Sequence, residues 1–337
     1  MDRPVTIVDI AEAAHVSPST VSRVLRRDSR ISAATTQRVH DAAVELGYRP
    51  NLSAQELVSG RSMTIGVLIQ HPASRYFGAI LNGIEFALAE LGAGYHTLVA
   101  SGSWEPEREL HALDLLVRRR VDALIVAGGT LPAAELGAVA AGVPLVCIGR
   151  PSPQGSGFEV VVENRDAARR AVEHLIALGH RRIAHITGDP VMTDARARLA
   201  GYLEALRAAD IAPDAALVVE GAFLVDGGAR GVTELLDHGV EFTGLFVAND
   251  VMAPSALLTL ARRGFDVPGA VSVVGFDDDE QTPWLDPPLT TMRQPLFEIG
   301  WSAAQGALRL IDGEDAQLPV FVPELILRES TGPPPSY

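Results

Sequence analysis

The sequence contains no lysine, and all 28 of its basic residues are arginine. A phosphate-binding loop of the Walker A type requires a lysine. Enzymes that form a Schiff base with their substrate, or with pyridoxal phosphate, require one as well. The absence of lysine therefore excludes these classes.

Cysteine and long apolar runs are also scarce. The single cysteine, Cys147, cannot form a disulfide within the chain and lies in an apolar segment, where we expect it to be inert. No apolar run reaches the roughly 18 residues that a membrane-spanning helix needs. The first ten residues, MDRPVTIVDI, lack the apolar core of a signal peptide. We therefore expect a cytoplasmic protein without a membrane partner.

The chain is long, apolar and acidic. Its 337 residues are 47% hydrophobic, which predicts large packed cores in two or three domains. The formal net charge is −14, yet five arginines between residues 23 and 38 accompany a single acid, Asp28. A local basic cluster on an acidic chain is typical of a small DNA-binding head on a body that repels DNA.

Three short helices are predicted in the first 50 residues. Thr6, Ser17 and Ser32 each stand where a helix N-cap is expected, and apolar residues follow at helical spacing. His15 is expected to make the turn between the first two helices, and Gly47 to end the third. Two short helices joined by a tight turn and braced by a third are the helix-turn-helix plan, in which the second helix enters the major groove.

The pattern changes to alternating strands and helices from residue 64. This alternation predicts parallel sheets with helices on both faces, and the strands are too many for one sheet. We therefore expect two α/β lobes, with the β-rich stretch 318–328 completing both. The predicted strands are 64–70, 95–100, 122–128, 144–149, 182–187, 216–219, 244–247 and 271–275, and the predicted helices are 79–91, 105–118, 132–141, 165–178, 195–209, 226–238 and 250–263.

Sequence runs typical of one protein family occur in order along nearly the whole chain. They are TIVDIAEAAHVSPSTVSRVL (6–25), YRPN (48–51), AQEL (54–57), IGVLI (65–69), HLIALGHRRIAHITGD (174–189), RARLAGY (196–202), FVANDVMA (246–253), VSVVGFDD (271–278) and PPLTTMRQP (287–295). In these runs the chain resembles the LacI/GalR family of bacterial repressors.

The resemblance implies a helix-turn-helix head, a hinge helix and a core like that of the periplasmic binding proteins. In such a core, three crossovers join two doubly wound parallel-sheet lobes, and members of the family are usually dimers or tetramers. The implied divisions are a head at 1–50, a hinge helix at 51–61, a first lobe at 62–163 and 292–320, a second lobe at 164–291 and 321–331, and a disordered tail at 332–337.

The resemblance also implies which residues contact an operator in double-stranded DNA. Arg23 is the strongest candidate for reading a base, because its guanidinium can bond O6 and N7 of guanine together. Leu57 matches a hinge leucine that wedges into the minor groove, with Ala54 beside it. For Ser17, helix capping alone is an equal alternative to a phosphate contact. The full implied set adds Pro18 and Ser19 as base contacts and Thr6, Ser17, Thr20, Ser22 and Asn51 as phosphate contacts.

The same resemblance implies a small-molecule effector between the lobes. Its implied contacts are Gln70, Tyr76, Phe77, Arg150, Arg198, Phe223, Asn249, Asp250, Asp277 and Gln294. Carboxylates, amides and arginine around aromatic faces suit a polyol such as a sugar, whose hydroxyls both donate and accept hydrogen bonds.

Some of these assignments have alternatives. A solvated turn is the alternative for Asp277, and ordinary core packing is the alternative for Tyr76 and Phe77. Gly149 stands where some sugar-binding relatives have aspartate, and we expect the adjacent Arg150 to contribute in its place.

These observations favour a ligand-responsive transcription regulator, most often a repressor, that binds a pseudo-palindromic operator as a dimer. A purine or phosphorylated effector in the same fold is one alternative, and a sugar-binding module without regulation is another. An enzyme ranks last, because no catalytic pair or Ser-His-Asp motif is present. His174, His180 and His185 lack metal-ligand spacing, so no metal or cofactor is expected.

Overall fold

The computed structural model describes residues 5–25, 30–48, 60–92, 94–153, 158–315 and 318–335. The chain divides into two compact units, Met1–Ser62 and Met63–Tyr337. None of the described helices combines the length and the apolarity that crossing a bilayer requires.

The first unit contains the predicted helices α1 (Ile7–Ala13), α2 (Pro18–Leu25) and α3 (Ala33–Glu45). Their buried faces meet in one small core, to which Ile10, Val21, Val24 and Val39 contribute. His15, with φ of 51°, turns the chain between α1 and α2. This arrangement confirms the predicted helix-turn-helix.

Helix caps fix the ends of these helices as the sequence predicts. The Asp9 carboxylate accepts hydrogen bonds from both the backbone N–H and the hydroxyl of Thr6, each at 2.7 Å. Ser32 Oγ accepts the N–H of Thr35 at 3.3 Å. Gly47 follows α3 with φ of +64°, a conformation that glycine adopts without strain.

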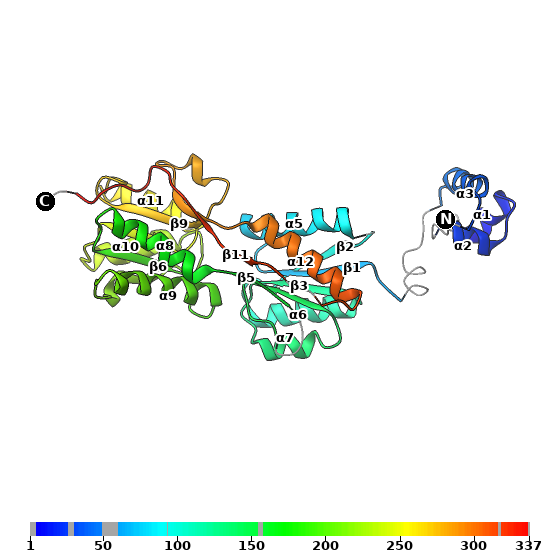
Figure 1. The fold of residues 1–337 in the computed structure, drawn as a ribbon, viewed down its shortest axis with the longest axis horizontal. Helices are drawn as coiled ribbons and strands as arrows, with labels where there is room; N and C mark the ends of the chain where they lie inside the picture. The colour runs from blue at the N-terminus through cyan, green and yellow to red at the C-terminus, as the bar shows by residue number, and fades with distance from the viewer. Residues whose placement is uncertain are drawn as a thin grey trace. The chain divides into compact units, whose positions relative to one another are not determined.

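The first lobe of the second unit is a six-stranded sheet in the order β11-β5-β4-β3-β1-β2. All of its strand pairs are parallel. Helices α5 and α12 cover one face, while α6 and α7 cover the other (Figure 1). The strands are β1 (Thr64–Ile69), β2 (His96–Ser101), β3 (Ala123–Ala127), β4 (Leu145–Ile148), β5 (Phe158–Val162) and β11 (Val320–Phe321), and the helices are α5 (Arg75–Leu91), α6 (Pro106–Arg118), α7 (Ala133–Val139) and α12 (Leu296–Ile311).

Alternate residues of the central strands face opposite cores. Ile65 and Val67 of β1 pack toward α5 and α12, whereas Leu68 packs toward α6 and α7. Both faces of the sheet are therefore buried, which explains why TIGVLI is an almost continuous apolar run.

The second lobe is a six-stranded sheet in the order β12-β10-β9-β8-β6-β7, antiparallel only between β10 and β12. Helices α8 and α9 contribute to one of its cores, and α10 and α11 to the other. The strands are β6 (Ile183–Thr187), β7 (Val218–Glu220), β8 (Gly244–Val247), β9 (Ser272–Asp277), β10 (Thr290–Arg293) and β12 (Glu324–Ile326), and the helices are α8 (Asn164–Ala177), α9 (Thr193–Ala208), α10 (Gly227–Asp237) and α11 (Ala253–Arg262).

The chain passes between the lobes three times (Figure 1). The crossings lie between β5 and α8, between β10 and α12, and between β11 and β12. Residues 318–328 thus supply a strand to each sheet, as predicted. The two doubly wound lobes confirm the predicted fold class.

Several helix pairs pack backbone against backbone at glycines. A Cβ added to Gly83 of α5 would lie 2.0 Å from the carbonyl oxygen of Phe297 in α12. A Cβ added to Gly300 of α12 would lie 2.0 Å from the carbonyl oxygen of Ile80 in α5. Only glycine permits this approach at either position.

Some predicted elements differ from those observed. Strands β5 and β10 and helix α12 were not predicted from periodicity, and α5 begins at Arg75 rather than at residue 79. A disordered tail from residue 332 is wrong at Gly332, whose carbonyl oxygen accepts hydrogen bonds from His180 and Ser272, both at 2.9 Å. His180 and Ser272 are buried polar residues that need these partners.

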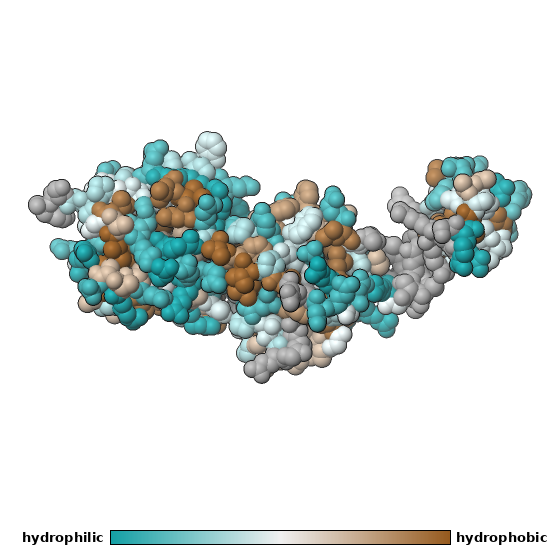
Figure 2. Space-filling model, viewed as in Figure 1, coloured by the Kyte–Doolittle hydropathy of each residue, from teal (hydrophilic) through white to brown (hydrophobic). Residues whose placement is uncertain are grey.

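Hydrophobic side chains reach the surface of the second unit in a few places (Figure 2). One patch lies over α11, where Leu258 is exposed. Another lies beside β11, where Val320 and Val322 are exposed.

Candidate functional site

Helix α2 carries five of the ten predicted DNA contacts, and three of the five are exposed to solvent. Ser19 and Arg23 are exposed, as is Pro18 at the first helical position, whereas Val21 and Val24 point into the core of the head. Thr20 and Ser22 are half-buried at the edge of this surface.

The hydroxyls of Ser17 and Thr6 take part in helix capping. Ser17 Oγ accepts the N–H of Thr20 at 3.2 Å and is hydrogen-bonded to Ser19 Oγ at 2.7 Å. Capping by Ser17 is therefore observed, and a phosphate contact by the same residue stays a prediction. The predicted hinge contacts Asn51, Ala54 and Leu57 lie outside the described residues.

A cavity of about 500 Å³ lies between the two lobes of the second unit. Gly128, Gly149 and Asn249 line it just beyond the carboxyl ends of β3, β4 and β8, and Asp277 lines it at the end of β9. The carboxyl ends of parallel strands are where open α/β sheets bind ligands. The volume is within the range of small-molecule sites in proteins.

Aromatic rings from both lobes line the cavity. In the first lobe Phe77 contacts Tyr76 edge-on at 5.1 Å and Trp104 at 6.0 Å between ring centroids. Phe223 lines the cavity from the second lobe. Trp104 and Phe223 have φ of 59°, which is a strained conformation for a bulky residue and places both rings at the cavity.

Arg198 of α9 supplies a buried positive charge to the cavity. Its Nε donates to Asn164 Oδ1 at 2.9 Å, and its guanidinium carbon lies 3.7 Å from the centroid of the Phe276 ring. Nη1 lies 3.5 Å from Asp277 Oδ1. Stacking, hydrogen bonds and the ion pair together fix the guanidinium in place.

Asp277 and Asp194 are two carboxylates of the lining that interact electrostatically with this arginine. Asp277 Oδ1 accepts Gln294 Nε2 at 2.7 Å, and Asp194 Oδ1 accepts Asn164 Nδ2 at 3.0 Å. Burial raises the pKa of each above the ordinary range of aspartate, while Arg198 acts in the opposite direction. Burial, reinforced by these two carboxylates, also raises the pKa of Tyr76, so its phenol is a neutral hydrogen-bonding group.

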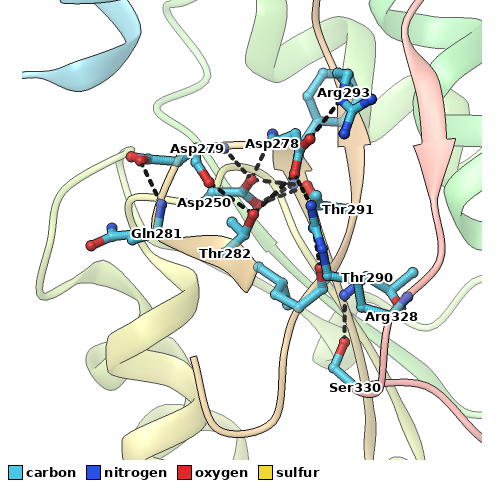
Figure 3. Close-up of polar contacts among 12 residues, drawn as sticks. Asp250, Asp278, Asp279, Gln281, Thr282, Thr290, Thr291, Arg293, Arg328 and Ser330 are labelled. Carbon is cyan, nitrogen blue, oxygen red and sulfur yellow. Dashed lines mark hydrogen bonds and ion pairs between the residues drawn. The ribbon is translucent and has the colours of Figure 1, made fainter. Parts of the chain in front are cut away.

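A polar network behind the cavity fixes the loop after β9 (Figure 3). The Asp250 carboxylate accepts the N–H groups of Phe276, Asp278 and Asp279 at 2.8, 2.7 and 3.1 Å, and the hydroxyl of Thr291 at 2.9 Å. Four donors on one buried carboxylate hold the backbone that presents Asp277 and Asp279 to the cavity.

Asp278 continues this network away from the cavity. Its carboxylate accepts Arg293 Nε at 2.6 Å, Arg328 Nη2 at 2.7 Å and the hydroxyl of Thr282 at 2.9 Å (Figure 3). Arg293 ends β10 at the second crossing, and Arg328 follows β12 after the third, whereas Thr282 lies in the connection between β9 and β10. The network therefore ties the loop to two of the segments that join the lobes.

Six of the ten predicted effector contacts line the cavity, and four do not. The six are Tyr76, Phe77, Arg198, Phe223, Asn249 and Asp277. Gln70, Arg150, Asp250 and Gln294 lie behind the lining. Gln70 Oε1 accepts the N–H of Trp104 at 3.1 Å, and Gln294 orients Asp277.

Arg150 does not substitute for a side chain at Gly149. Its guanidinium turns into the first lobe, where it donates to the carbonyl oxygens of Gly128 and Leu131. Buried Glu109 lies 3.7 Å from it and accepts the N–H of Thr130 at 2.8 Å. These contacts fix the cavity-lining loop at residues 128–131.

Asp194 and Trp104 line the cavity but were not predicted. Asp194 lies one helical turn before Arg198 on α9, so the i, i+4 spacing in TDARAR could have identified it. Trp104 carried no comparable signal, because its position depends on the strained turn at Ser103 and Trp104. No group of histidine, cysteine and carboxylate side chains suited to a metal ion occurs among the described residues.

Comparisons with known proteins agree with both units. The sequence profile described as "Bacterial regulatory proteins, lacI family" matches residues 6–51, and that described as "Periplasmic binding protein-like domain" matches residues 172–331. The chain is 36% identical to the HTH-type transcriptional regulator GalR of Escherichia coli (strain K12), over 98% of this chain and 96% of that protein.

Two solved structures are similar over nearly the whole chain. One is a lac repressor dimer bound to operator and the anti-inducer ONPF, with a TM-score of 0.88, 32% identity, and coverage of 98% of this chain and 100% of that one. The other is a complex of the transcriptional regulator CelR with cellobiose, with a TM-score of 0.72, 34% identity, and coverage of 97% and 100%.

Proposed function

This chain belongs to the LacI family of bacterial regulatory proteins, and from that premise we propose that it is a dimeric repressor of a pseudo-palindromic operator with a sugar-like effector. It is a DNA-binding transcriptional regulator with an effector-binding domain, not an enzyme. We place its action in the bacterial cytoplasm, where the chromosome lies.

The observation that carries the proposal is a cavity whose lining comes from both lobes. Tyr76 and Trp104 of the first lobe face the same space as Arg198 and Asp277 of the second. A ligand that contacts both lobes binds one relative orientation of them better than another. It can therefore shift the regulator between two states by that difference in affinity.

The composition of the cavity supports a sugar. Aromatic faces accommodate the CH groups of a sugar ring, while the carboxylates, Asn249 and Arg198 offer acceptors and donors to its hydroxyls. The similar CelR structure contains cellobiose.

Exposed apolar side chains support a dimer. Phe86 and Leu91 of α5 are exposed, as is Val99 on the same side of the neighbouring edge strand β2. An apolar surface of this kind is typical of an interface. A second copy of the chain is its proposed occupant, and the similar lac repressor structure is a dimer.

The test is to select operators and then to titrate effectors. Purified full-length protein is used to select from a random pool of double-stranded DNA, and the selected sequence is measured by fluorescence anisotropy at one fixed salt concentration. We expect an inverted repeat, and a change in its affinity of at least about tenfold when cellobiose, D-galactose or a related sugar binds. Selection of no sequence, or conversion of a sugar to product, contradicts the proposal.

A further inference from the structure

Asp194 reaches from the second lobe to the backbone of the first. It is the second residue of α9, whereas Gly149 follows β4 in the first lobe. A Cβ added to Gly149 would lie 3.0 Å from Asp194 Oδ2. The carboxylate therefore occupies the space that a side chain at position 149 would need, and Gly149 has φ of +65°, a conformation that disfavours any other residue.

The two cavities between the lobes meet at this carboxylate. Asp194, Thr193 and Gly149 line both the cavity of about 500 Å³ and a second one of about 150 Å³. The second cavity is bordered by Glu163 and Asn164 at the first crossing. Asp194 is therefore accessible to a ligand from two sides.

One oxygen of this carboxylate is available to a ligand. Oδ1 accepts Asn164 Nδ2, but Oδ2 accepts no hydrogen bond from the described part of the chain. No ion pair joins Asp194 to a described cation, and Arg198, one turn along α9, is paired with Asp277. Arg75, the other arginine of the lining, lies 3.8 Å from Asp279. The lining thus holds three carboxylates against two arginines, and Asp194 is the carboxylate without an ion-pair partner.

We propose that Asp194 selects the ligand, accepting a hydrogen bond from a hydroxyl of an uncharged polyol and excluding phosphorylated or otherwise anionic ligands. The inference rests on the proposed function of the cavity and specifies its ligand class. A carboxylate only accepts hydrogen bonds, so a hydroxyl donor satisfies it and a phosphate oxygen does not. The negative charge of Asp194, with no described cation to neutralise it, repels an anionic ligand and so disfavours its binding.

The test compares the binding of neutral sugars with that of anionic probes, and D-glucose with D-glucose 6-phosphate is the matched pair. Calorimetric titration measures D-glucose, D-galactose and cellobiose as neutral probes and D-glucose 6-phosphate and inorganic phosphate as anionic ones. The proteins are the wild type, Asp194→Asn, Asp194→Glu and the control Asp226→Asn. Asp226 is an exposed carboxylate paired with Arg230 on α10 and does not line the cavity. Thermal unfolding shows which variants retain the fold.

In the wild type we expect a neutral sugar to bind and the anionic probes to bind at least about tenfold more weakly. Asp194→Asn should lower the affinity for the neutral sugar by about tenfold and raise the affinity for the anionic probes by about tenfold. Asp194→Glu should keep the exclusion of anions, and Asp226→Asn should change neither affinity.

The outcomes separate this inference from the proposed function. Unchanged affinities in a folded Asp194→Asn overturn the inference and leave the regulator intact. Anionic probes that bind the wild type as well as sugars do also overturn it. If no sugar binds the wild type, the sugar-effector proposal fails. The measurements with the anionic probes still test the role of Asp194. A higher affinity for these probes in Asp194→Asn than in the wild type supports that role, and an equal affinity overturns it.

Discussion

Three consecutive aspartates, Asp277 to Asp279, have three different partners. Asp277 faces Arg198 and the cavity, Asp278 faces Arg293 and Arg328, and Asp279 lies at the cavity and accepts the N–H of Gln281. Positive φ values of 121° and 60° at Asp277 and Asp278 turn the chain between them. Backbone conformation therefore gives identical side chains separate roles.

Arg23 tests the base-reading surface of the head. Arg23→Ala should weaken binding to the selected operator by about 1–3 kcal/mol and relax the preference at one base position, because a bidentate contact to guanine is lost. Arg38→Ala is the control, since Arg38 is an exposed arginine on α3. Its loss should affect all DNA sequences alike. If the Arg23→Ala protein keeps the same base preference, Arg23 does not read a base.

His185 predicts a pH dependence of stability. Its ring is fully buried and stacked on Phe246 at 4.7 Å, and burial lowers its pKa to about 4. Between this value and the ordinary pKa of about 6.5, the unfolded chain binds the proton and the folded chain does not. The contribution of neutral His185 to the free energy of unfolding is therefore fully present above pH 6.5. It is lost as the pH falls from 6.5 toward 4.

The comparison that isolates this effect is His185→Phe, which keeps an aromatic ring but cannot titrate. From pH 7 to pH 5 the wild type should lose about 2 kcal/mol more unfolding free energy than the variant. All three tryptophans, Trp104, Trp284 and Trp301, lie in the second unit. Their fluorescence during denaturation in urea therefore reports on it directly. Parallel pH profiles for the two proteins would contradict the expectation.

At the residue scale, motifs predicted which positions lie near the cavity better than which side chains face it. Gln70 and Arg150 follow β1 and β4 at the correct end of the sheet, yet both turn inward. One residue beyond a strand, the direction of a side chain depends on the local φ and ψ, which a motif does not reveal. Trp104 was missed for the same reason, whereas Asp194 lies on α9, where its helical spacing from Arg198 could have identified it.

At the scale of elements, the sequence pattern predicted most helices and strands, the exposed edge strand β2 included. Strands β5 (FEVVV) and β10 (TTMR) were missed although both contain β-branched residues, which favour strands. Helix α12 was missed although it is 16 residues long. Its buried face consists largely of small residues, such as Gly300, Ala303 and Ala307, and it packs closely on α5 at Gly300.

The contact between α5 and α12 makes its own prediction. Gly83→Ala should destabilise the second unit by about 1–3 kcal/mol or more, because the added methyl group meets the backbone of α12. Gly78→Ala is the matched control on the same helix, where an added Cβ meets nothing within 4 Å. That change should be neutral or stabilise by about 0.5–1 kcal/mol. Equal unfolding free energies for both variants, measured in urea, would show that the helices can separate at no cost.

At the scale of the whole molecule, the exposed surface of α5 and β2 predicts association. Phe86→Glu places a charge on this surface and should raise the dimer dissociation constant by at least about tenfold, measured by sedimentation equilibrium. Affinity for the operator should fall as the dimer dissociates, because each head binds only one half-site. Val322→Glu, which alters an exposed valine beyond β11, is the control. A Phe86→Glu protein that remains dimeric would place the interface elsewhere.

The interleaved topology also sets an order of events during translation. The three helices of the head are complete once Glu45 has been made, whereas each lobe lacks a strand until residues 320–326 emerge. The gap is roughly 280 residues, or on the order of half a minute at 5–20 residues per second. Every newly made chain therefore carries a folded head before it carries the lobes that regulate it, and the ribosome holds it through that interval.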